Sequence, residues 1–161
     1  MENDPWAILN YEIQMYFGAR ILQSARFSHL YPEMIKVLES AMTEVKLLHI
    51  RILVEIFLKR KHKDDINIDD LLPAWRENNR AVLDDLKTAY TTDLAIGRSS
   101  EWYLNKFLAH PDRERGFGFD WAPIVKQMDP PLRRVFSTLP SFPLQFLDFV
   151  RRNYPSLTRI E

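Results

Sequence analysis

The stretch PEMIKVLESAMTEVKLLHIRILVEIFLKRK, residues 32–61, decides the fold. Its proline suits the first turn of a helix, and its apolar residues recur at spacings of three and four. One stripe consists of Met34, Leu38, Ala41, Val45, Leu48, Ile52 and Ile56, and a second of Leu47, Ile50, Val54 and Phe57. We therefore predict a helix from Pro32 to about Lys61 whose second half lies in the middle of a helical bundle.

Helical periodicity continues on both sides of this stretch. Asp4 can cap a first helix and Pro5 suits its first turn, while Gly18 within it indicates close packing against a neighbour. The expected further helices span residues 4–30, 75–90, 99–109, 120–138 and 143–154. No strand pattern or internal repeat is present. We predict a single all-α domain over residues 1–161, a bundle of five to seven helices led by two long antiparallel ones.

Composition excludes several classes of function. The 161 residues contain 22 Lys and Arg, 22 Asp and Glu, and no cysteine. A disulfide framework, a thiolate zinc site and a cysteine nucleophile are therefore impossible. Zero formal net charge gives no global attraction to nucleic acid, although it leaves room for a local basic patch. His29, His49, His62 and His110 form no pair at a four-residue spacing, so we predict no metal site and no cofactor.

The most apolar run, Leu47–Leu58, is too short for a membrane span, which needs about 20 residues. It also contains charged side chains and is better interpreted as a buried helix. The first residues show no basic region followed by an apolar stretch, so no secretory signal is indicated. We expect a cytoplasmic protein without a membrane-spanning segment.

Two side chains of the central stretch are candidate binding residues. His49 lies on the first apolar stripe, where a histidine is either a hydrogen-bonded core residue or part of a site. Arg51 faces nearly the opposite way, about 200° around the helix. Its four-residue spacing from Glu55 allows an ion pair, which a buried arginine would require.

The segment WYLNKFLAH, residues 102–110, is the most informative for function. Tyr103, Lys106 and His110 fall along one face of a helix at spacings of three and four. His110 precedes a proline and is expected at the helix C-terminus, where the dipole favours a charged imidazole that suits a general acid or base. Arg113 and Arg115 follow closely and could hold a phosphate. The alternative is a capping histidine beside a solvated basic loop.

Asn105-Lys-Phe-Leu-Ala-His110 resembles the signature of HEPN-type helical proteins. The resemblance spans roughly residues 45–140 and includes the His49-x-Arg51 pair, the acidic segment 64–70 and a Trp-containing segment, as in a group of uncharacterised bacterial HEPN-like proteins. Many HEPN proteins are metal-independent ribonucleases of toxin–antitoxin and defence systems. Their motif has an arginine, an adjacent polar residue and a histidine, and their sites often form at a dimer interface.

This chain departs from the motif because Leu104 stands where the arginine belongs. The resemblance therefore implies two functions. The first is a non-catalytic module that binds a protein, nucleotide or RNA partner, with Asn105, His110 and His49 in a buried polar network. The second is a metal-independent endoribonuclease in which His110 moves a proton, Asn105 positions the site and Arg51 or Arg113 replaces the missing charge. Either function fits a homodimer.

Overall fold

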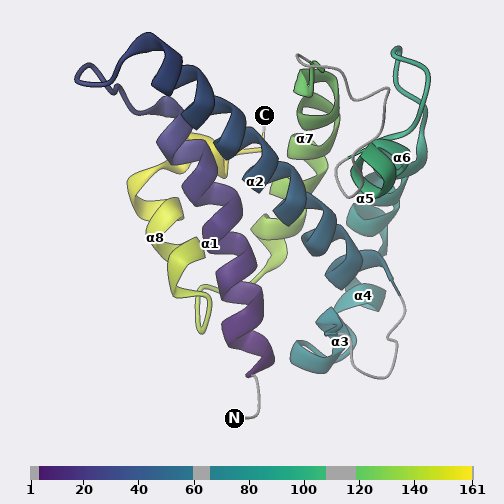
Figure 1. Cartoon of the computed structure of the whole chain (residues 1–161). Helices are drawn as coiled ribbons and strands as arrows, with labels where there is room; N and C mark the ends of the chain where they lie inside the picture. The colour runs from purple at the N-terminus through teal and green to yellow at the C-terminus, as the bar shows by residue number, and fades with distance from the viewer. Residues whose placement is uncertain (1–3, 60–65, 108–118, 161) are drawn as a thin grey trace.

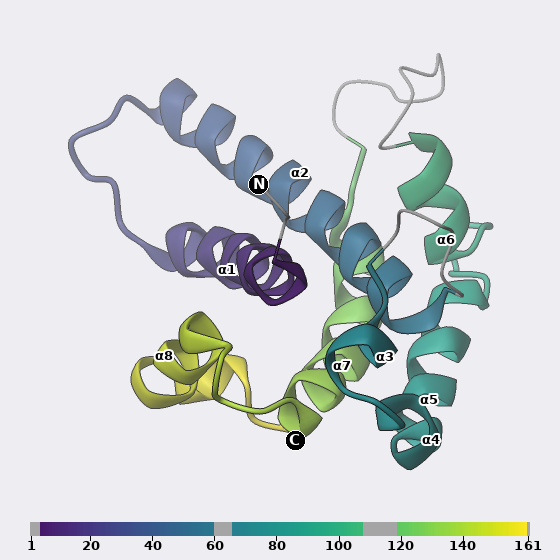
Figure 2. The same cartoon turned by 90° about the horizontal axis from the view of Figure 1, so that it is seen from below.

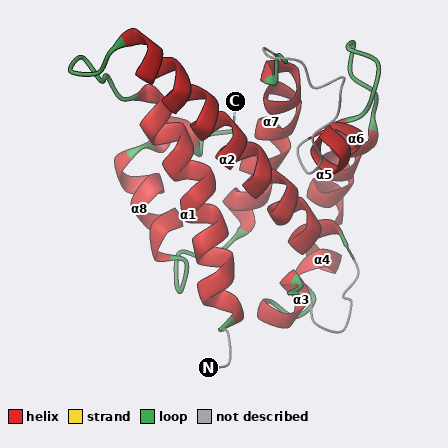
Figure 3. Ribbon diagram, in the orientation of Figure 1, coloured by secondary structure: helices red, strands yellow, loops and turns green. Residues whose placement is uncertain are grey.

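The computed structural model describes residues 4–59, 66–107 and 119–160. Within these ranges the chain is helical and contains no strand (Figures 1 and 3). The α-helices are α1 (Pro5–Ser24), α2 (Pro32–Leu58), α3 (Ile68–Leu71), α4 (Trp75–Asn78), α5 (Arg80–Thr91), α6 (Ser100–Trp102), α7 (Ala122–Thr138) and α8 (Gln145–Asn153). A π-helical segment, η1 (Tyr103–Phe107), continues α6, and a 3-10 turn, η2 (Pro155–Leu157), follows α8.

The predicted all-α class is confirmed, but the number of helices is not. The described residues form eight α-helical segments instead of five to seven, because the expected helix over 75–90 divides at Asn79 and α3 adds one further turn. Asn79 has φ −118° and ψ 27°, which interrupts the helical backbone between α4 and α5. The first helix ends at Ser24 instead of residue 30, and the second ends at Leu58 instead of Lys61.

The helices are arranged around α7, which lies between two groups of elements (Figures 1 and 2). On one side α1 packs along α2, and α8 packs against α1. On the other side α5 packs along α7, and α6 contacts both of them. The connection over residues 25–31 therefore lies on the opposite side of the molecule from α6 (Figures 1 and 2).

The two apolar stripes of α2 are buried to different extents, although Ile56 at the end of the first stripe is also buried. Leu47, Ile50, Val54 and Phe57 are fully buried, as predicted for the second half of the helix. The first stripe is only partly covered: Met34 is 52% exposed and Leu48 is 42% exposed. Periodicity identifies apolar faces without showing which of two adjacent faces finds a neighbour.

A polar junction joins α1, α2 and α7 inside the molecule. Asp129 of α7 accepts hydrogen bonds from the Tyr16 hydroxyl at 2.8 Å and from Lys46 Nζ at 3.1 Å. Arg20 Nη1 lies 3.1 Å from Oδ2 of the same carboxylate. Burial lowers the pKa of Lys46, while the charge of Asp129 opposes that shift. Burial also raises the pKa of Tyr16. The junction thus fixes three helices through one carboxylate.

Gly18 of α1 does not mark the close packing that the sequence indicates. A Cβ atom at this position would meet no other atom within 4 Å. The glycine therefore lowers the helical propensity of α1 without a packing gain.

No helix in the described ranges is long and apolar enough to cross a membrane.

Candidate functional site

Asn105 lies in the π-helical segment η1, which packs against α2. Ser99 begins this part of the chain, because its hydroxyl accepts a hydrogen bond from the backbone N–H of Trp102 at 3.2 Å. Ser99 is therefore the N-cap of α6. Isolated π-helical turns are rare and frequently occur at functional sites.

The amide of Asn105 contacts a buried tyrosine of α5. Its Nδ2 donates to the Tyr90 hydroxyl at 3.4 Å, and Tyr90 is only 3% exposed. Burial, followed by the charge of Glu101, raises the pKa of Tyr90 to about 12, whereas the hydrogen bond from Asn105 lowers it. The phenol therefore stays protonated at neutral pH and can donate a hydrogen bond in turn.

Arg51 and Glu55 reach the same region electrostatically from α2. Glu55 raises the pKa of Tyr90 and Arg51 lowers it. The two side chains also pair with each other, with 3.6 Å between Arg51 Nε and Glu55 Oε1, so the predicted ion pair is confirmed. The Arg51 side chain is 30% exposed, so it is accessible to a ligand while the pair holds its orientation.

Leu104, which stands where the resemblance leads one to expect an arginine, is fully buried. It belongs to the hydrophobic core, so residue 104 points into the protein and away from solvent. A guanidinium at this position would be desolvated, which costs several kcal/mol without a paired charge. The departure from the motif is thus accommodated by the packing of η1.

Lys106 lies on the opposite face of η1 and is exposed. Its Nζ sits over the Trp102 ring at 5.5 Å from the centroid, and Arg98 sits over the same ring at 5.7 Å. Tyr103, expected on the same face as Lys106, is 6% exposed and turned inward. The expected face is wrong because i→i+5 bonding changes the angular spacing on which an α-helical pattern depends.

Aromatic rings extend this exposed cation–aromatic group towards α7. Trp102 contacts Tyr103 edge-on, with 5.0 Å between ring centroids, and Tyr103 lies 5.3 Å from Phe119. Phe119 in turn contacts Trp121 at 4.7 Å. Trp102, Phe119 and Trp121 are half-buried, so each presents part of a ring to solvent.

His49 lies apart from this region. Its Nδ1 is 2.5 Å from Glu12 Oε2, and both side chains are buried between α1 and α2. The ring also meets Tyr11 edge-on at 5.9 Å between centroids. Within the described ranges no hydrogen bond joins His49 to Asn105, so the expected network through these two residues is not formed there.

Three predicted residues, His110, Arg113 and Arg115, lie outside the described residues. Sequence reasoning missed three residues of this region: Tyr90, which is hydrogen-bonded to Asn105, Glu101, whose charge acts on Tyr90, and Arg98, which lies over Trp102. Arg98 and Glu101 lie within seven positions of Asn105, so their spacing from Trp102 and Asn105 could have indicated them. Tyr90 is on another helix and gave no signal beyond its helical periodicity.

In the part of the chain that the structure describes, no three His, Cys, Asp or Glu side chains gather where a metal ion would be held. The chemistry available around Asn105 is therefore that of an amide, a protonated phenol and an Arg–Glu pair. Such groups donate and accept hydrogen bonds to an anionic or polar ligand.

Comparisons with family models, with curated proteins and with solved structures find no match for this chain.

Proposed function

We propose that this protein is a non-catalytic HEPN-like module that binds RNA or a nucleotide through the face formed by α6 and η1. The observation that carries the proposal is the burial of Leu104. In the motif this position supplies the arginine that stabilises the phosphate, and here its side chain belongs to the core. The amide of Asn105, the neighbouring motif residue, is already hydrogen-bonded to Tyr90.

The class of ligand is inferred from Arg98, Trp102 and Lys106. Two exposed cations beside a half-buried indole combine phosphate contacts with a ring on which a base can stack. Such a face suits a single-stranded nucleic acid or nucleotide better than a protein partner, because charged residues are depleted in the centre of protein interfaces. A local patch of this kind is compatible with zero net charge.

The wider assignment is part of the same proposal. It comprises a HEPN-like bundle in which α1 and α2 are the two long antiparallel helices, a homodimer and a cytoplasmic location. Support comes from the succession of two long helices joined by a short connection and packed along each other. The polar motif lies on a short helix that contacts the second of them.

Fluorescence anisotropy with a labelled single-stranded RNA tests the binding proposal. We expect the Arg98→Ala/Lys106→Ala variant to bind at least about tenfold more weakly and to lose part of the salt dependence. The matched control is Arg80→Ala/Lys87→Ala, which removes two exposed cations from α5 and should bind like the parent. Equal affinities for the parent and both variants would contradict the proposed face.

A second function, a metal-independent endoribonuclease, is favoured by one observation. Arg51 acts on the pKa of Tyr90, to which Asn105 is hydrogen-bonded, so a cation is near the motif despite Leu104. RNA cleavage in EDTA separates the two functions. We expect intact RNA with the parent, whereas cleavage that disappears in Asn105→Ala and His110→Ala would establish the ribonuclease.

Leu104→Arg sharpens this comparison. It restores the motif in sequence, yet we expect no cleavage and a lower unfolding temperature because residue 104 is fully buried. Lys106→Arg places an arginine on the exposed face of the same segment and serves as the control, with an unchanged unfolding temperature. A folded Leu104→Arg protein that cleaves RNA would show that the arginine can reach the site.

A further inference from the structure

The polar junction of α1, α2 and α7 contains more positive than negative charge. Arg20 and Lys46 each lie 3.1 Å from Oδ2 of Asp129, so two cations share one carboxylate. Arg133 follows Asp129 by four positions on the same face of α7. The pKa of Lys46 is lowered first by burial and also by the charges of Arg20 and Arg133. Three cations therefore gather around a single carboxylate, which leaves an excess of two positive charges.

Arg133 has donors that the described residues do not satisfy. Its hydrogen bond within these ranges runs from Nη1 to the carbonyl oxygen of Ser156 at 3.5 Å, which is a long contact. Its Nε is buried and has no acceptor in the same part of the chain. A buried donor without an acceptor destabilises the folded protein, and more so when it belongs to a charged group. An anion at this position would supply both the acceptor and the missing negative charge.

Arg20 also retains donors, and it lies where the junction reaches the surface. It makes its described contacts, with the Tyr16 hydroxyl and with Asp129, through Nη1 alone. The side chains of Arg20 and Asp129 are 15% and 12% exposed, whereas that of Lys46 is 5% exposed. Because Asp129 already accepts from Tyr16 and Lys46, the remaining guanidinium donors need an acceptor from outside the junction.

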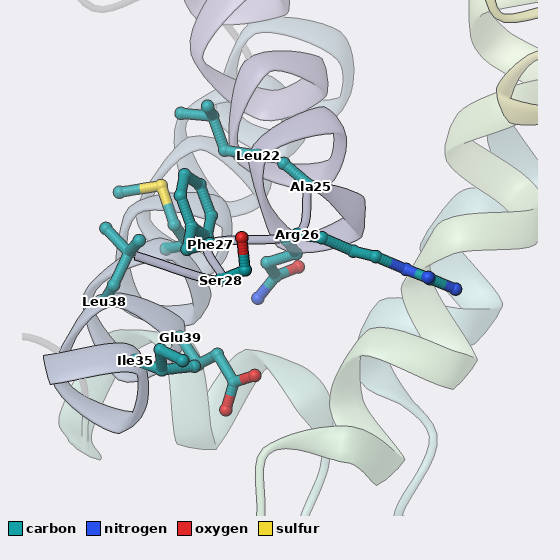
Figure 4. A pocket seen from close by; sticks show the side chains of 10 residues that line it. Leu22, Ala25, Arg26, Phe27, Ser28, Ile35, Leu38 and Glu39 are labelled. Carbon is teal, nitrogen blue, oxygen red and sulfur yellow. The ribbon is translucent and has the colours of Figure 1, made fainter. Parts of the chain in front are cut away.

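A hollow between the end of α1 and the start of α2 has the opposite character. It is lined by apolar side chains, among them Leu22, Phe27 and Leu38 (Figure 4). Arg26 extends away from these side chains, and Glu39 places a carboxylate in the lining (Figure 4). An anion is therefore expected at the junction and not in this hollow.

We propose that Arg20, Lys46 and Arg133 form a binding site for a phosphate dianion at the junction. Oxygens of the phosphate accept from the guanidinium groups of Arg20 and Arg133, whose planar forks suit a tetrahedral anion. Lys46 stays bonded to Asp129 and attracts the ligand by its charge. Two negative charges balance the excess of the junction, whether the phosphate is free or is the phosphoryl group of a larger molecule. The three cations belong to α1, α2 and α7, so the proposal is independent of the α6–η1 face.

Thermal unfolding in increasing inorganic phosphate tests the proposal, at mildly alkaline pH and with chloride holding the ionic strength constant. We expect a saturable rise of about 3–6 °C in the midpoint of the parent. Arg133→Met should bind phosphate at least about tenfold more weakly, because it removes charged donors. The matched control is Arg134→Met, which removes the neighbouring arginine, paired with Asp85, and should respond like the parent. General stabilisation by phosphate as a salt does not saturate and is equal in both variants.

Two further measurements complete the test. Arg133→Lys keeps the charge without the planar fork and should bind phosphate with an affinity between those of the parent and Arg133→Met, which preserves the test should the methionine variant not fold. Adenosine monophosphate distinguishes the sources of the phosphate: a response lost in Arg133→Met but kept in Arg98→Ala/Lys106→Ala shows that the junction accepts an attached phosphoryl group, and a response to inorganic phosphate alone shows a site for the free anion. A parent without a saturable response to either ligand, or equal responses of the parent and the Arg133 variants, overturns the proposal.

Discussion

Tyr90 is a buried phenol whose protonation is coupled to the candidate site. Its pKa is raised from 10.0 to about 12, first by burial and then by Glu101. Between these values the folded protein holds a proton that the unfolded chain has released. The stability that this group contributes is therefore complete below about pH 10 and is lost as the pH rises towards 12.

We expect Tyr90→Phe to reduce the loss of unfolding free energy at alkaline pH. The parent should lose about 1–2 kcal/mol more unfolding free energy than the variant between pH 10 and 12. Urea unfolding at several alkaline pH values measures the difference. Parallel curves for the two proteins would show that Tyr90 titrates normally in the folded state.

The sequence identified Asn105 and Arg51 but not Tyr90, which interacts with both. Helical spacing places side chains relative to their own helix, which is why the Arg51–Glu55 pair was predictable. It cannot place Tyr90, which lies 15 positions before Asn105 on another helix. The inward turn of Tyr103 was also beyond the pattern, since a π-helical turn is set by packing and not by residue type.

Side chains from distant positions complete the ends of three helices. Arg76 donates from α4 to the carbonyls of Ile56, Leu58 and Lys59 at the end of α2. Gln127 of α7 donates to Ala89 and Thr92 at the end of α5. Arg151 of α8 donates to Phe136 and Leu139 at the end of α7. A chain with four glycines thus satisfies carbonyls that glycine motifs often satisfy elsewhere.

Arg76→Met should therefore destabilise α2 although the residue lies outside it. Three carbonyls lose a charged donor, and we expect a loss of about 1.5–3 kcal/mol in unfolding free energy. Arg80→Met removes an exposed arginine of the neighbouring helix α5 and should change stability by less than about 0.5 kcal/mol. Chemical unfolding followed by circular dichroism measures both, and equal effects would refute the capping role.

Gly18→Ala should have the opposite effect on α1. The residue is inside a 20-residue helix and its added Cβ meets open space. We expect a gain of about 0.5–1 kcal/mol from helical propensity alone. Thermal unfolding measures it, and a lower midpoint for the variant would mean that the glycine has a packing role after all.

Helix starts in this chain were more predictable than helix ends. Asp4 and Ser99 cap their helices locally, and local caps can be recognised in sequence. At the end of α2 the donors are instead Arg76 and Asn67, both of which donate to the Lys59 carbonyl. Donors that are distant in sequence leave no local signal.

Over the whole molecule, the junction at Asp129 holds three helices in one arrangement. Asp129→Asn leaves Lys46 and Arg20 without their shared counter-charge, and we expect a loss of about 3–5 kcal/mol. Lys46→Met should cost less, because Asp129 keeps Tyr16 and Arg20. We expect the double variant to lose about 1–3 kcal/mol less than the sum of the single losses.

Urea unfolding of the four proteins gives this coupling directly. Additive losses would indicate that Lys46 and Asp129 contribute independently, against the 3.1 Å contact.

At the scale of the whole molecule, the sequence predicted the all-α class because periodicity is a local property. It did not predict the junction, since Lys46 and Asp129 are separated by 83 positions and neither charge breaks a pattern on its own helix.

The junction also constrains how this sequence can change over time. A substitution of Asp129 alone leaves Lys46 and Arg20 without their counter-charge, whereas replacement of all three residues by apolar residues of similar size removes the charges without that penalty. Descendants of this chain should therefore alter the three positions together. Such covariation would record the packing of α2 against α7 in sequences alone.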